Sequence, residues 1–116
     1  RQQAVDAIAA GMGLVRAQKA AGVQLLATGE MGIGNTTTSS AVAAVLLGQP
    51  VERMTGRGAG LSDAGLACKL DAIRQGIARN RPDAADPLDV LSKLGGFDIA
   101  GLCGVFLGGA LEACPC

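Results

Sequence analysis

The stretch VQLLATGEMGIGNTTTSS, residues 23–40, decides the fold expected for this chain. Val23–Thr28 is a short apolar run followed directly by Gly29, and such a run is typical of a parallel strand buried on both faces. Three glycines within residues 29–34 predict a tight turn, and a helix is expected to open near Thr36 and run to Gly48. A helix, a strand, a glycine-rich turn and a second helix in this order favour an α/β fold.

Apolar residues at helical spacing predict further helices on both sides of this stretch, with a second glycine-rich loop between two of them. In chain order, the expected features are a helix over 2–21 that ends at Gly22, a loop at 55–61 after Pro50, a helix with Ser62 as N-cap, a helix from Asp86–Pro87 to Gly95, and a last helix from about Asp98 to Ala113. Only one segment is a clear strand candidate. The chain is therefore expected to be mostly helical with one or few strands, as a piece of a larger α/β protein whose sheet continues on both sides of the Val23 strand.

The charge and composition of the chain exclude several classes of protein. Ten Lys and Arg residues balance ten Asp and Glu residues among the 116, so the basic excess of a nucleic-acid binder or an anionic-membrane binder is missing. The hydrophobic share of 49% argues against disorder, and the absence of His excludes a Cys/His zinc site and a histidine general base. The longest apolar run, residues 99–111, is too short to span a bilayer. We therefore expect neither a nucleic-acid partner nor a membrane partner.

The four cysteines are interpreted as reduced thiols, buried or idle, in a reducing cytosol. Cys68 and Cys103 fall inside apolar helical patterns, and Cys114 and Cys116 form a C-x-C pair. A disulfide framework would suit a short secreted chain, and no signal peptide is recognised here. A four-cysteine metal site would need better-placed pairs, so no metal is expected.

The turn GEMGIGN at 29–35 is the strongest candidate for a binding site. Its glycines let backbone N–H groups approach an anion, and the turn leads into a helix N-terminus, where unpaired N–H groups favour phosphate. The same pattern would arise from a tight turn in which Thr36 only caps the helix. The turn departs from the P-loop because Asn35 stands where the phosphate-binding lysine belongs, and from the dinucleotide motif because Thr37 stands at the third glycine.

Glu30 is unusual inside such a turn because its carboxylate would repel a phosphate. Its presence is understandable if the side chain points to a neighbouring subsite. There it could accept a hydrogen bond from a substrate N–H or stabilise a developing positive charge. The alternative is a solvent-exposed turn carboxylate without a chemical role.

A second glycine-rich loop, TGRGAGLSD at 55–63, precedes the helix that carries Lys69. Two such loops in one short chain predict two walls of one site. Lys69 falls at the edge of that helix's apolar stripe, and because helical side chains lean toward the N-terminus, its ammonium can reach back to the loop and pair with a phosphate. The alternative is a lysine that lies along the core boundary and keeps its charge in water. Arg57 could also serve a phosphate, but a mobile loop arginine fits the pattern better.

Three segments of the chain resemble one family of enzymes. The resemblance is carried by GEMGIGNTTTSSAVAAVLLG, by TGRGAGLSDAGLACK and by DPLDVLSKLGGFDIAGLCG, which together span nearly the whole chain in one order. They are similar to the central third of nicotinate-nucleotide–dimethylbenzimidazole phosphoribosyltransferase. The string GEMGIGNTT is highly specific to this family, whereas a high glycine content alone is not.

This resemblance implies a three-layer αβα fold around a parallel sheet, and a homodimer in the bacterial cytoplasm. It implies transfer of phosphoribose from nicotinate mononucleotide to 5,6-dimethylbenzimidazole, which gives α-ribazole 5′-phosphate and nicotinate in cobalamin nucleotide-loop assembly, without a metal or organic cofactor. Residues 1–116 would form the central part of a single catalytic domain whose N- and C-terminal parts are absent. The family's general base is a glutamate of the C-terminal part, beyond Cys116, so the chain by itself is expected to be inactive.

The resemblance also implies roles for individual residues. Glu30 and Met31 would border the benzimidazole and the ribose, with Glu30 in a supporting catalytic role, and Lys69 would contact the phosphate. The other implied substrate-binding residues lie in the two glycine-rich loops and at the start of the last helix: Gly32, Ile33, Gly34, Asn35, Thr36, Gly58, Gly60 and Asp98. For Asp98, an N-cap of the last helix is the simpler interpretation.

The second loop departs from the usual family pattern G-x-G-T-G-x-D-D at two positions. Ala59 replaces the threonine and Ser62 replaces the first aspartate, so one hydroxyl and one carboxylate are lost. The alternative function is that of an inactive truncated homologue that only binds nucleotide phosphate. A purely structural module is a further alternative.

Overall fold

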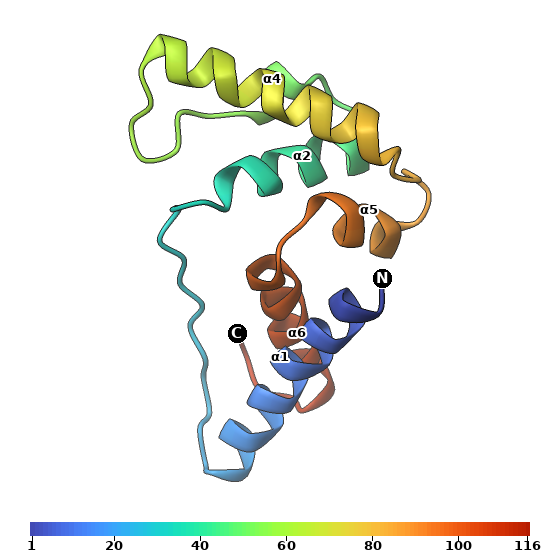
Figure 1. The fold of residues 1–116 in the computed structure, drawn as a ribbon. Coiled ribbons are helices and arrows are strands. Elements are labelled where there is room, and N and C mark those ends of the chain that lie inside the picture. Colours follow the sequence, from blue (N-terminus) through green and yellow to red (C-terminus); the bar gives the residue numbers. More distant parts are fainter. The chain divides into compact units, whose positions relative to one another are not determined.

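The computed structural model describes residues 1–116 and is mostly helical, without any strand (Figure 1). Its helices are α1 (Gln2–Ala20), α2 (Thr36–Leu46), α3 (Val51–Met54), α4 (Asp63–Asn80), α5 (Pro87–Leu94) and α6 (Phe97–Leu111). The chain divides into two compact units. We call Met31–Gly96, with Arg1, the loop unit, and we call Gln2–Glu30 with Phe97–Cys116 the helix-pair unit.

Helices α2, α4 and α5 of the loop unit close around one apolar core. Ile73 of α4 and Val90 of α5 are almost completely buried, and they pack with Ala41 of α2 and Leu94 of α5. Complete burial of a branched side chain such as Ile73 contributes about 1.5–3 kcal/mol. This core holds α2 against α4, so the two helices that follow the glycine-rich loops are fixed relative to each other.

Side-chain caps define the starts of α4 and α5, as the sequence predicts. The Ser62 hydroxyl accepts a hydrogen bond from the backbone N–H of Gly65 at 3.2 Å. The Asp86 carboxylate accepts hydrogen bonds from the N–H groups of Leu88 and Asp89, both at 3.1 Å, and a proline occupies the first turn of α5. Caps of this kind contribute about 1 kcal/mol each. Both predicted N-caps are confirmed.

Helices α1 and α6 of the helix-pair unit lie side by side at very short range (Figure 1). A glycine makes this approach possible, since a Cβ added at Gly104 of α6 would lie 2.0 Å from the carbonyl oxygen of Ile8 in α1. Val15 of α1 packs beside this contact with Val105 and Cys114, and all three are buried. The apolar, glycine-rich α6 therefore serves close helix packing. None of the helices reaches the combination of length and hydropathy that a membrane span requires.

The strand predicted over Val23–Thr28 is wrong for this structure. The segment is extended, and Leu26 donates a backbone hydrogen bond to the Pro115 carbonyl at 2.9 Å, but no ladder follows. A parallel strand exists only with a neighbouring strand that completes its hydrogen bonds, and the 70% exposed side chain of Leu25 shows that one face is uncovered. Of the mostly helical α/β expectation, only the helical part is confirmed.

Gly104→Ala is expected to destabilise the helix-pair unit, because the added methyl group would collide with the Ile8 carbonyl. The free energy of unfolding in urea should fall by about 1–3 kcal/mol, the range for overpacked contacts. Gly13→Ala is the matched control, because Gly13 lies in α1 with nothing within 4 Å of an added Cβ. That control should be neutral or stabilising by up to about 1 kcal/mol. Equal effects of the two substitutions would contradict the close packing.

Candidate functional site

Both glycine-rich loops of the loop unit line one cavity of about 560 Å³, which we call the anion cavity. One wall is the turn before α2, and the other is the loop before α4. The predicted binding residues that line it are Gly32, Ile33, Gly34, Thr36, Gly58, Gly60 and Lys69. The expectation that the two loops face one common space is therefore confirmed, and the binding of a ligand there stays a prediction.

Lys69 of α4 brings a buried positive charge to this cavity. The residue is only 7% exposed, and its Nζ donates hydrogen bonds to the Thr36 hydroxyl at 2.8 Å and to the Gly56 carbonyl at 3.1 Å. None of the ion pairs in the structure includes Lys69. The expectation that its side chain reaches back to the loop is confirmed, and the alternative of a charge held in water is wrong. A buried ammonium with neutral acceptors and no counter-ion favours an anionic ligand.

The N-terminus of α2 adjoins the same cavity and has no side-chain cap. Asn35 occupies the N-cap position and is buried, but its side chain makes no capping hydrogen bond and does not line the cavity. Thr36 is the first helical residue, and its hydroxyl accepts from Lys69, so the interpretation of Thr36 as the cap is wrong. The backbone N–H groups of the first turn therefore lack a side-chain acceptor, which suits them to an anion.

Six residues outside the predicted set also line the anion cavity: Thr37, Arg57, Ala59, Leu61, Gly65 and Cys68. Arg57 donates to the Leu61 carbonyl at 2.9 Å and forms an ion pair with Asp63, so its charge is already partnered within the loop. Cys68 is an exposed free thiol, although it falls within the apolar sequence pattern of its helix. Its position one residue before the buried lysine is the only sequence signal that could have found it.

Glu30 belongs to the helix-pair unit, where it lines a different cavity of about 680 Å³, which we call the acidic cavity. Helices α1 and α6 supply its mostly apolar walls, which include Leu14 and Phe97, and Asp98 lines the same space. The structure thus brings Glu30 together with Asp98, and no carboxylate lines the anion cavity. Met31 is 82% exposed and lines neither of these two cavities.

Asp98 is not an N-cap, because α6 already begins at Phe97 and Asp98 is its second residue. A carboxylate in the first turn of a helix is favoured by the helix dipole. Together with Glu30 it gives the acidic cavity two carboxylates on an apolar surface. Such an arrangement suits the N–H groups of a flat heteroaromatic base or a developing positive charge.

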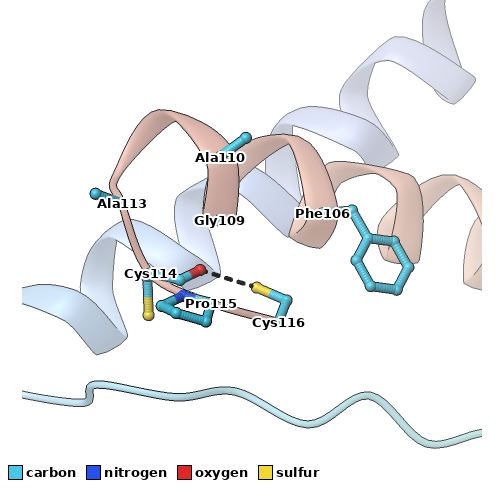
Figure 2. A pocket seen from close by; sticks show the side chains of 7 residues that line it. All are labelled: Phe106, Gly109, Ala110, Ala113, Cys114, Pro115 and Cys116. Carbon is cyan, nitrogen blue, oxygen red and sulfur yellow. Dashed lines mark hydrogen bonds between the residues drawn. The ribbon is translucent and has the colours of Figure 1, made fainter.

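A third cavity, near the end of α6, contains two of the four cysteines (Figure 2). The Cys116 thiol lies 3.3 Å from the Cys114 carbonyl oxygen, toward which it is turned, rather than toward the Cys114 sulfur. All four cysteines are free, and only Cys114 is buried. The structure thus has one buried and three exposed free thiols, where the sequence left burial open for each. No group of three or more Cys, Asp or Glu side chains is placed to hold a metal ion.

The sequence matches a known family over its whole length. Residues 1–116 match the family described as Phosphoribosyltransferase, and the chain belongs to that family. It is 56% identical over 115 residues to the nicotinate-nucleotide–dimethylbenzimidazole phosphoribosyltransferase of Desulforudis audaxviator. The proteins of the same name from Acetivibrio thermocellus and Roseiflexus sp. are 57% and 56% identical. Each match covers 99% of this chain and 33% of the relative, so the chain spans about a third of the length of these relatives.

Gly58→Ala tests whether the loop must stay open beside Lys69. Gly58 has a φ of +57°, and an added Cβ would lie 3.0 Å from the Thr36 hydroxyl oxygen and 3.6 Å from Lys69 Nζ. The methyl group would therefore take up space next to the ammonium. We expect inorganic phosphate to bind about tenfold more weakly in a calorimetric titration, which corresponds to the loss of one good hydrogen bond.

Gly48→Ala is the matched control for this experiment. Gly48 has a φ of +58°, but nothing lies within 4 Å of an added Cβ, and the residue does not line the anion cavity. The control therefore carries the same backbone strain, about 1–2 kcal/mol, without approaching the ammonium. Equal phosphate affinities of Gly58→Ala and the unchanged protein would contradict the assignment of the anion cavity.

Proposed function

We propose that the protein containing this chain transfers the phosphoribosyl group of nicotinate mononucleotide to 5,6-dimethylbenzimidazole, giving α-ribazole 5′-phosphate and nicotinate. In this proposal the anion cavity holds the 5′-phosphate of the nucleotide. The observation that carries it is the buried ammonium of Lys69, which lines a cavity between two glycine-rich loops without a carboxylate partner. The names of the relatives support this choice of donor and acceptor.

In this proposal the loop unit orients the donor and takes no part in bond breaking. Lys69 supplies a charge-assisted hydrogen bond to the phosphate, and the first turn of α2 supplies backbone N–H donors. Thr37, which lines the same cavity, would add a hydroxyl donor. Binding energy gained at the phosphate thereby positions the ribose for the chemical step.

The chemical step itself calls for carboxylates. Breaking the N-glycosidic bond builds positive charge on the ribose, and the incoming benzimidazole loses its N–H proton as its other nitrogen attacks. Glu30 would stabilise that charge or share in the proton relay, and Asp98, on the same acidic cavity, would assist it. Because the chain has no histidine, we place the general base on a glutamate outside residues 1–116.

The architecture proposed for the complete enzyme is a three-layer αβα fold in a cytoplasmic homodimer. The extended Val23–Thr28 segment supports a strand position in such a fold, because Leu26 already donates a backbone hydrogen bond to Pro115. A further layer would also cover the exposed side chain of Leu25.

Lys69→Met in the full-length enzyme tests the phosphate contact. Methionine keeps an unbranched stem and removes the ammonium, so the KM for nicotinate mononucleotide should rise about 10–100-fold, the loss of a hydrogen bond to a charged group. The kcat should fall much less, because the phosphate lies away from the bond that breaks. Steady-state assays of α-ribazole 5′-phosphate formation measure both constants. Lys93→Met is the control, because Lys93 is an exposed lysine of α5 that pairs with Asp89 and does not line the anion cavity.

An unchanged KM in a folded Lys69→Met enzyme would remove Lys69 from the phosphate site. Since Lys69 also holds Thr36 and Gly56, thermal melting must show that the variant folds. Thr36→Val is a second variant, because it removes one acceptor of the ammonium and keeps the charge; its KM should rise less than that of Lys69→Met. Nucleotide binding by the full-length protein without turnover would instead support the alternative function, an inactive relative that only binds nucleotide phosphate.

Glu30→Gln tests the role of the acidic cavity, because it keeps the size of the side chain and removes its negative charge. The kcat should fall about 100-fold, the lower end of the range for acid–base assistance, while the KM for nicotinate mononucleotide changes little. Glu112→Gln is the matched control, since Glu112 is a carboxylate of the helix-pair unit that pairs with Arg16 and lines neither cavity. Equal kcat values for the two variants would leave Glu30 as a turn carboxylate without a chemical role.

A further inference from the structure

The anion cavity contains a thiol that the proposed function does not use. Cys68 lies near the start of α4, is exposed and free, and lines the same cavity as the two glycine-rich loops. The other exposed cysteines, Cys103 and Cys116, belong to the helix-pair unit and do not line this cavity. Cys68 is therefore the cysteine whose modification would fill the place assigned to phosphate.

A second observation shows which reagents the cavity would attract. Lys69 is more than nine-tenths buried and lines the same cavity as Cys68. Its ammonium has only the neutral oxygens of Thr36 and Gly56 as acceptors. Arg57, the other cation on the cavity, is already paired with Asp63. The uncompensated charge of Lys69 raises the local concentration of anions beside Cys68.

We propose that Cys68 is a modification site for small anionic disulfides, meaning disulfides whose substituents carry carboxylate groups. The Cys68 thiol gives its proton to solvent, and the thiolate attacks one sulfur of the disulfide. A Cys68–sulfur bond forms, the sulfur–sulfur bond of the reagent breaks, and the other half leaves as a thiolate. The substituent that remains lies in the anion cavity, so this modification and phosphate binding exclude each other. The inference rests on the anion cavity of the proposed function.

The test compares two alkylating reagents of similar size on the full-length protein, anionic iodoacetate and neutral iodoacetamide. Trypsin places Cys68 alone in the peptide 58–69. Cys103 falls in a separate peptide that begins at Leu94 and also contains Cys114 and Cys116, so fragment-ion spectra of one digest report both thiols. The ratio of iodoacetate to iodoacetamide labelling at Cys68 should exceed the ratio at Cys103 by about tenfold at low salt, the lower end of electrostatic steering. Saturating inorganic phosphate should abolish this excess at Cys68 and leave Cys103 unchanged.

The disulfide itself is tested with oxidised glutathione as the probe. Treated protein should carry glutathione on the Cys68 peptide, and its affinity for phosphate in calorimetry should fall. Reduction with dithiothreitol should restore the phosphate affinity. Cys68→Ser is the control variant, and its phosphate affinity should be the same before and after treatment. This comparison within one variant does not depend on how the substitution itself affects the cavity.

The outcomes separate this inference from the proposed function. Three results would each overturn the Cys68 proposal and leave the phosphate site standing. The first is an equal reagent ratio at Cys68 and Cys103, and the second is no labelling of Cys68. The third is no protection of Cys68 by phosphate under conditions where calorimetry shows that phosphate is bound. A full-length protein that binds neither phosphate nor nicotinate mononucleotide would overturn both.

Discussion

The buried ammonium of Lys69 is the interaction on which the arrangement of the loop unit depends. Removing a charge from water costs on the order of several kcal/mol unless hydrogen bonds replace the lost hydration. Here the Thr36 hydroxyl and the Gly56 carbonyl provide such bonds, one from the start of α2 and the other from the loop before α4. The Lys69 ammonium thereby connects both walls of the anion cavity to α4. The shape of the cavity depends on these two hydrogen bonds.

The distribution of the remaining charges leaves this ammonium without a counter-ion. Glu30, the carboxylate of the first glycine-rich turn, lines the acidic cavity of the helix-pair unit. Asp63 could neutralise a cation at the second loop, but it is paired with Arg57. The two cavities thus differ in charge. The anion cavity contains a lysine without a counter-ion, and the acidic cavity contains two carboxylates on an apolar surface.

The features that were predictable from the sequence are those set by a few neighbouring residues. The Ser62 and Asp86 caps follow from bonds to backbone groups two or three residues away, and the direction of Lys69 follows from the geometry of one helix. The prediction of a strand over Val23–Thr28 failed because a strand requires a second strand to hydrogen-bond with. No local sequence pattern shows whether that second strand is present. The place of Cys68 at the anion cavity was not predictable for a similar reason, since the apolar stripe of α4 does not reveal which of its edges borders a cavity.

A comparison with the P-loop shows why a local motif is an incomplete test for phosphate chemistry. In the P-loop the lysine follows the last glycine directly, and in this chain Asn35 holds that position. The ammonium instead comes from α4, 33 residues after the threonine that it contacts. Because the cation arrives from a separate helix, the phosphate site proposed here would need only small residues and backbone N–H groups in the turn. The orientation of these groups depends on the packing of α2 against α4. The Ile73 core is therefore as necessary to the anion cavity as the glycines that line it.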